Sequence, residues 1–205
     1  MHTPIKNALL LIAAAALSTG AAAHIGVDST GVGHSHADGL LAGFLHPLSG
    51  MDHLAAMLAV GLWSALTARR AWPDLIWAPL GFSVMLLIGT LMGLQGVVLP
   101  AVEPMIAASL LVMGLLVLTR WRASGMAAGA LVGLFAVFHG LAHGHELAGA
   151  ASAASTVTGM LAATLLLHAT GLAAGWALRH TSVWLPRAVG ACVALAGLTL
   201  LARLA

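Results

Sequence analysis

Three side chains that can bind a metal lie inside the first long apolar stretch of the chain, between Leu40 and Leu66. They are His46, Asp52 and His53. An ionisable side chain at membrane depth costs roughly 2.5–3.5 kcal/mol on insertion scales, so such residues usually mark a pathway or a site. Imidazole and carboxylate groups also bind divalent transition metals. The segment from 46 to 53 therefore indicates a metal site more than a hydrogen-bonded helix end.

The spacing within this segment predicts how the groups share their roles. His46 and His53 are seven residues apart and face the same side of a helix. Asp52 points about 100° away from His53, where it is either a ligand or the acceptor of the imidazole N–H. Pro47 and Gly50 favour a local break of the helix, which frees backbone carbonyls beside the site.

A second group of candidate ligands lies near the end of the fourth apolar run. His139, His143 and Glu146 stand at i, i+4 and i+7, which places them on one stripe of a helix. A His-x3-His pair on a helix can bind one metal ion. Glu146 is then a third ligand or a charge at the mouth of the site. No Glu follows His139 directly, so this is not the zinc-protease motif.

The composition predicts an all-α membrane protein. Of the 205 residues, 60% are hydrophobic and only 7% are charged, whereas soluble domains carry about 25% charged residues. Cys192 is the one cysteine and cannot form an internal disulfide. There are no basic clusters with interleaved aromatic residues, so no nucleic-acid partner is expected. A Gly-x4-Gly-Lys-Ser/Thr nucleotide motif is absent as well, which argues against direct driving by ATP.

Six apolar runs predict six transmembrane helices, and the basic residues predict their orientation. Six of the eight Lys and Arg residues fall in alternate loops, which the positive-inside rule assigns to the cytoplasm. We therefore expect a multi-pass protein of the inner membrane whose mature N-terminus is extracytoplasmic. The runs are Leu40–Leu66, Leu75–Leu94, Met105–Thr119, Ala123–Ala142, Val157–Leu178 and Leu185–Leu204.

The first 23 residues resemble a secretory signal peptide. Lys6 supplies a positive charge, Ala8 to Leu17 is a short apolar core, and three alanines end at Ala23 as a cleavage site. A retained first membrane helix is the alternative. The expected organisation is a signal peptide over 1–23, an extracytoplasmic segment with histidines over 24–39, and a six-helix permease domain over 40–205.

With this orientation, three different helices carry histidines at similar depth. His168 lies near the middle of the fifth run, and it is either a ligand or only a hydrogen bond between helices. Matching depth favours a shared cation pathway. The predicted metal residues are His46, Asp52, His53, His139, His143, Glu146 and His168. Candidates for extracytoplasmic capture are His24, His34 and His36, and Glu103 is a candidate at the mouth.

These motifs resemble the HupE/UreJ family of nickel permeases. The segment HPLSGMDHLAAMLAVGLW from His46 is similar to the family's first signature, and Phe138 to Glu146 and Leu167 to Gly171 are similar to its second and third histidine segments. The first motif is one residue longer than the His-x4-Asp-His signature of the broader nickel/cobalt transporters. The resemblance covers the mature chain and implies uptake of nickel, or cobalt, for urease or hydrogenase maturation.

We therefore expect a secondary transporter, not an enzyme, whose substrate is Ni²⁺ or Co²⁺ and which holds no prosthetic group. The ion enters past the capture histidines and the mouth, sheds water against the predicted ligands, and leaves inward when the helices rearrange. Two alternatives stay open. One is a membrane metal sensor or assembly protein that does not transport. The other is an intramembrane metalloenzyme, which the few carboxylates and the missing His-Glu-x2-His unit disfavour.

Overall fold

The computed structural model describes residues 36–69, 72–179 and 183–205. These residues form helices and connecting loops and contain no strand, so the predicted all-α class is confirmed. The predicted signal peptide, His24 and His34 lie outside the described residues. The helices are α2 (His36–Ser49), α3 (Met51–Thr67), α4 (Trp77–Leu94), α5 (Val102–Thr119), α6 (Gly125–Glu146), α7 (Ala153–Leu178) and α8 (Trp184–Leu204).

The first apolar run, Leu40–Leu66, is divided between two helices, so the predicted local break is confirmed. α2 ends at Ser49 and α3 begins at Met51, with Gly50 between them in an extended conformation at φ −85° and ψ 112°. The break at Gly50 comes three residues after Pro47, which lies inside α2 and has no N–H to donate to the helix. α3 is a shorter apolar helix, whereas the five helices from α4 to α8 are each long and apolar enough to cross a membrane.

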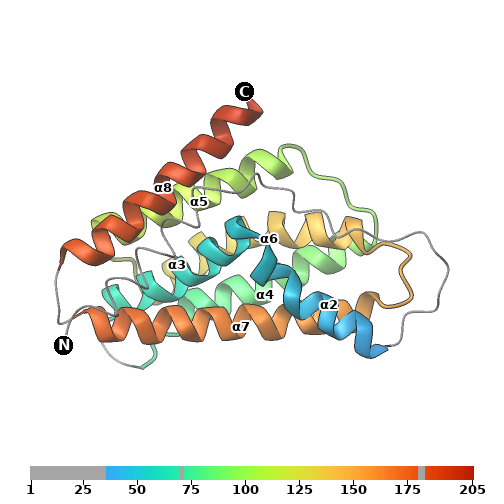
Figure 1. The fold of residues 1–205 in the computed structure, drawn as a ribbon, viewed down its shortest axis with the longest axis horizontal. Helices are drawn as coiled ribbons and strands as arrows, with labels where there is room; N and C mark the ends of the chain where they lie inside the picture. Colours follow the sequence, from blue (N-terminus) through green and yellow to red (C-terminus); the bar gives the residue numbers. More distant parts are fainter. Residues whose placement is uncertain (1–35, 70–71, 180–182) are drawn as a thin grey trace.

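The helices pack mainly as three groups, two of parallel helices and one of antiparallel helices, α5 and α8. α2 and α3 follow one another along α7, α4 packs against α6, and α5 packs against α8 (Figure 1). Glycines allow the backbones to approach closely within each group. A Cβ added to Gly61 of α3 would lie 2.8 Å from the backbone nitrogen of Leu172 in α7. On Gly140 of α6 it would lie 2.7 Å from the nitrogen of Thr90 in α4.

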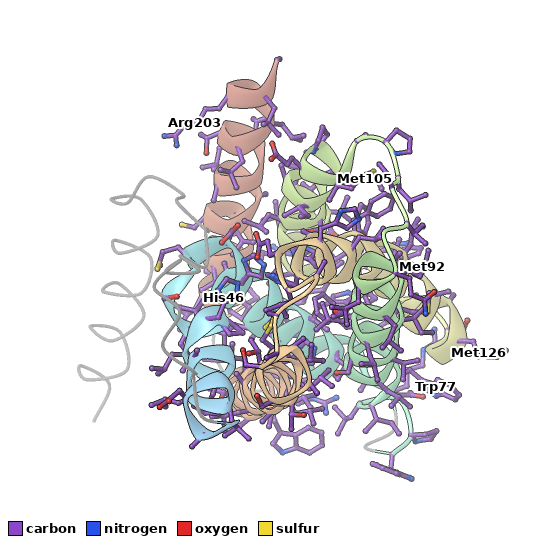
Figure 2. The ribbon with its side chains drawn as sticks, turned by 90° about the vertical axis from the view of Figure 1, so that its right-hand side faces the viewer. His46, Trp77, Met92, Met105, Met126 and Arg203 are labelled. Atoms are coloured by element: carbon purple, nitrogen blue, oxygen red, sulfur yellow. The ribbon has the colours of Figure 1, made fainter. Side chains whose placement is uncertain are left out.

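The outer surface is apolar along the helices, as a lipid environment requires. Leu134, Leu165 and Leu195 lie within three different helices and are 54%, 56% and 57% exposed. Met126, which is 74% exposed, lies with Trp77 on the side formed by α4 and α6, away from His46 (Figure 2). The interior holds one buried apolar cluster that includes Trp63 and Phe82.

Basic residues gather at one end of the molecule, which we call the arginine end. It is formed by the end of α3, the loop before α6 and the end of α7, which carry Arg69, Arg122 and Arg179. The Arg179 guanidinium donates a hydrogen bond of 3.0 Å to the carbonyl of Ala68, which ties the ends of α7 and α3 together. The opposite end holds the start of α2 and the end of α6.

Candidate metal centre

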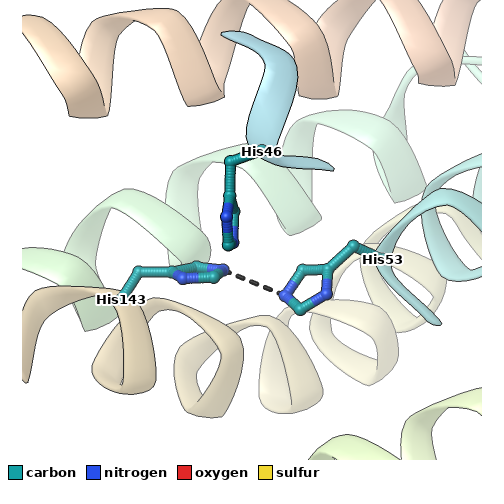
Figure 3. Close-up of side chains that lie close together, drawn as sticks. All are labelled: His46, His53 and His143. Carbon is teal, nitrogen blue, oxygen red and sulfur yellow. Dashed lines mark hydrogen bonds between the residues drawn. The ribbon is translucent and has the colours of Figure 1, made fainter. Parts of the chain in front are cut away.

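Three predicted ligands from three helices meet inside the bundle. His46 lies at the end of α2, His53 in the first turn of α3 and His143 in the last turns of α6. One ring nitrogen of each lies within 4.8 Å of the other two (Figure 3). The Nε2 atoms of His53 and His143 are 3.0 Å apart. We call this group the three-histidine site.

The break at Gly50 positions the first two imidazoles. It separates the helix that carries His46 from the helix that carries His53, yet the rings remain 5.6 Å apart between centroids. The glycine also leaves room for the site. A Cβ at Gly50 would lie 3.1 Å from Oδ1 of Asp52 and 3.3 Å from Nδ1 of His53. Because its φ of −85° suits any residue, this position needs glycine for space and not for backbone freedom.

Asp52 accepts hydrogen bonds from His53. This favours its predicted role as the group that orients the imidazole over its role as a metal ligand. Its Oδ1 accepts a 2.9 Å hydrogen bond from the backbone N–H of His53 and lies 3.0 Å from Nδ1 of the same residue. A carboxylate beside Nδ1 holds the proton there, so the lone pair is on Nε2. That nitrogen points toward His143.

Glu146 lies near His143 without a hydrogen bond to its ring. Its Oε2 is 3.5 Å from Nδ1 of His143, within ion-pair distance. The Nε2 atoms of His53 and His143 form a 3.0 Å hydrogen bond, so one of the two carries a proton in the metal-free protein. A cation that binds both nitrogens displaces this proton. The two carboxylates would also balance the charge of a divalent cation.

His46 completes a set of three imidazole nitrogens. Its Nε2 is shielded from solvent and has no hydrogen-bond partner, and its ring lies 4.8 Å from that of His143 between centroids. A buried polar atom without a partner carries a free-energy cost that a ligand removes. Three nitrogen ligands with a remaining open position suit zinc, nickel, cobalt or copper better than magnesium or calcium.

His139 lies beside the three-histidine site but outside it. It is fully buried, and its ring centroid is 5.2 Å from that of His53. The Ser109 hydroxyl donates its single proton to the carbonyl of Ile106, so it can only accept from Nε2 of His139 at 2.9 Å. The lone pair of His139 is then on Nδ1, which has no partner.

His168, on α7, also has one hydrogen-bonded and one unpartnered ring nitrogen. It contacts α3 one helical turn beyond His53. Its Nδ1 donates a 2.9 Å hydrogen bond to the carbonyl of Met57, because a carbonyl can only accept. Its Nε2 is buried and has no partner. The ring of Phe82 lies against His139 and His168, which we call the inner histidines, at 5.9 Å and 5.1 Å between centroids.

Other predicted residues lie apart from this centre. Glu103 is exposed in the first turn of α5, and no described contact joins it to the histidines. His36 begins α2, and its side chain lies outside the description. Sequence reasoning missed Ser109 and Phe82, because neither belongs to a ligand pattern and both reach the site only through helix packing. It also missed the space that Gly50 leaves.

Comparisons with known proteins agree with the motifs. The family model described as HupE / UreJ protein matches residues 11–200. The chain is 39% identical over 192 residues to the protein named Protein HupE of Rhizobium leguminosarum bv. viciae, which covers 93% of this chain and 94% of that protein. No solved structure matches the chain.

Proposed function

This chain belongs to the HupE/UreJ family, and from that premise we propose that it is a secondary transporter for a divalent transition-metal cation. The cation is nickel, with cobalt as the second choice, and it supplies the maturation of a metalloenzyme such as urease or hydrogenase. Membership of the family supports this choice, and the helices that can cross a membrane agree with it.

The observation that carries the proposal is the meeting of two Nε2 atoms with carboxylates behind them. His53 and His143 face each other at 3.0 Å, with Asp52 and Glu146 on the far sides of their rings. This arrangement points two ring nitrogens at one place and supplies negative charge nearby. A hydrated cation would exchange water for these nitrogens and for His46.

The direction of transport follows from the charges of the loops. The positive-inside rule assigns the arginine end to the cytoplasm. The three-histidine site lies toward the opposite end, because His53 is in the first turn of α3 and His143 is near the end of α6. The cation would therefore reach this site from outside, after capture by the segment that contains His24, His34 and His36.

Uptake of radiolabelled nickel by whole cells tests the proposal. Cells with His53→Ala should lose uptake, because the variant removes one ligand and the partner of His143. His145→Ala is a matched control: His145 is also on α6, but it is exposed and its Nε2 donates to the carbonyl of Val97 at 2.7 Å. Equal uptake by cells with wild-type protein and with His53→Ala, at equal membrane levels, would contradict the proposal.

A further inference from the structure

A cavity of about 500 Å³ lies at the arginine end of the molecule. Three helices line it: α3 through Trp63 and Ser64, α4 through Ala78, and α6 through Ala128. The charged residues Arg69, Arg122 and Asp74 also line it. None of these residues belongs to the three-histidine site or its neighbours, so the mechanism above leaves the cavity without a role.

The helices that carry the histidines also line this cavity. On α3, the buried residues His53, Met57, Val60 and Ser64 follow one another on one stripe. Ser64 is eleven residues after His53, which is about 16 Å along a helix. On α6, which runs in the opposite direction, Ala128 is eleven residues before His139. The histidines and the cavity are therefore two levels of one helix interface.

An apolar layer separates the two levels. It belongs to the buried apolar cluster of the described residues, and its side chains are at most 2% exposed. A cation could not cross it without losing its water, and an unpaired ion in an apolar interior is very costly. The conformation is therefore closed between the histidines and the cavity. The layer, which we call the apolar barrier, consists of Met57, Val60, Phe82, Val132 and Ala136.

Two free lone pairs border the apolar barrier. The N–H of His139 is held by Ser109 and the N–H of His168 by the carbonyl of Met57, which leaves Nδ1 of the first and Nε2 of the second without a partner. Both rings contact Phe82. A displacement of Phe82 would expose these nitrogens to a cation that leaves the three-histidine site.

We infer that the arginine-end cavity is the cytoplasmic vestibule from which the cation is released, and that the apolar barrier closes it off in this conformation. The inference rests on the proposed transport function. In the open form, the cation passes His139 and His168 and enters the cavity between α3, α4 and α6. Two arginines, Arg69 and Arg122, line the cavity against one carboxylate, Asp74, and this positive excess favours departure of the ion over its retention.

Single cysteines test this route in a Cys192→Ala background. Ala128 lines the cavity, whereas Ala136 lies on the same helix inside the apolar barrier and is fully buried. A charged, membrane-impermeant thiol reagent should label Ala128→Cys in inside-out vesicles and not in right-side-out vesicles. Ala136→Cys should stay unlabelled on both sides in the absence of nickel. Ala123→Cys, in the loop before α6, provides a second cavity position that is only half-buried.

The same labelled protein separates this inference from the proposed function. Labelling of Ala128→Cys should reduce nickel flux in proteoliposomes at least tenfold and leave nickel binding to the purified protein unchanged. Normal flux after complete labelling, or labelling from the outside only, overturns the vestibule and leaves the transport proposal intact. Failure of the unlabelled protein to move nickel overturns the transport proposal, whatever the labelling pattern.

Discussion

At the scale of single residues, the position of one proton on each imidazole determines what the site can bind. Asp52 accepts a hydrogen bond from Nδ1 of His53 and leaves its Nε2 as a ligand, and Glu146 adds negative charge near His143. Ser109 accepts from Nε2 of His139 and the carbonyl of Met57 accepts from Nδ1 of His168, so Nδ1 of the first and Nε2 of the second keep their lone pairs. Carboxylates lie beside His53 and His143, whereas only neutral acceptors contact His139 and His168, so the three-histidine site should bind a cation more strongly.

Replacement of Asp52 tests whether this carboxylate orients His53 or binds the metal. Asp52→Asn keeps an oxygen near Nδ1 and removes the negative charge, so the affinity for nickel should fall about 10- to 100-fold. Titration of the purified protein with nickel measures this change. X-ray absorption at the nickel edge should show the same number of imidazole ligands in both proteins. Loss of one oxygen ligand in the variant would show instead that Asp52 binds the metal directly.

The missing side chain of Gly50 should matter as much as a ligand. In Gly50→Ala, the new Cβ would crowd Asp52 and His53 at 3.1 and 3.3 Å, so the imidazole should lose its orientation. We expect weaker nickel binding by about tenfold and little change in thermal stability, because the backbone conformation suits alanine. Nickel titration and thermal unfolding in detergent measure both quantities. Unchanged affinity would show that the space beside Gly50 has no role.

Part of the site was predictable from the sequence. The ligand types and their spacing indicated His46, His53 and His143, because ionisable residues are rare and costly in membrane helices. The partition between outer and inner histidines was not predictable. His139 and His143 share a stripe of α6, yet Ser109 from α5 takes Nε2 of His139, and only the packing of these two helices reveals it.

At the scale of helices, hydropathy indicated where apolar segments lie but not how each begins or breaks. α5 begins at Val102 and includes Pro104 in its first turn, where a missing N–H is tolerated, so it is longer than the predicted run from Met105. The first run divides at Gly50, and each half packs against a different part of α7. Hydropathy averages over such a break because both halves are apolar.

Glycines should hold the helix groups together. In Gly140→Ala, the added Cβ would lie 2.7 Å from the nitrogen of Thr90, so α4 and α6 would have to separate. Such overpacking costs typically about 1–3 kcal/mol, and we expect a lower unfolding temperature in detergent. Ala130→Leu is a matched control, because Ala130 lies on the same helix and is exposed. Equal unfolding temperatures of Gly140→Ala and this control would contradict the role of the close contact.

At the scale of the whole molecule, the cation site is shared between helix groups. His46, His53 and His168 belong to the group of α2, α3 and α7, whereas His139, His143 and Phe82 belong to the pair of α4 and α6. Contacts through glycine are dense within each group, so a relative shift of the groups is the natural way to open the apolar barrier. Such a shift would change the distances between the ligand nitrogens and open the apolar barrier at the same time.

The orientation of the chain makes a separate prediction. If the arginine end faces the cytoplasm, α8 runs outward and Ala205 is extracytoplasmic. Alkaline phosphatase fused after Ala205 should be active, and the same enzyme fused after Arg122 should be inactive. Green fluorescent protein at these positions should give the reverse pattern. Activity of the phosphatase at Arg122 would place the release vestibule on the wrong side of the membrane.

Nickel flux into proteoliposomes tests the central claim, that the three-histidine site carries a cation across the membrane. Wild-type protein should move nickel down its gradient, and His143→Ala should reduce the rate at least about tenfold because it removes one of the two facing nitrogens. His145→Ala, two residues away and exposed, should transport at the wild-type rate. Equal rates for His143→Ala and wild type, or nickel binding without flux in the wild type, would contradict the claim.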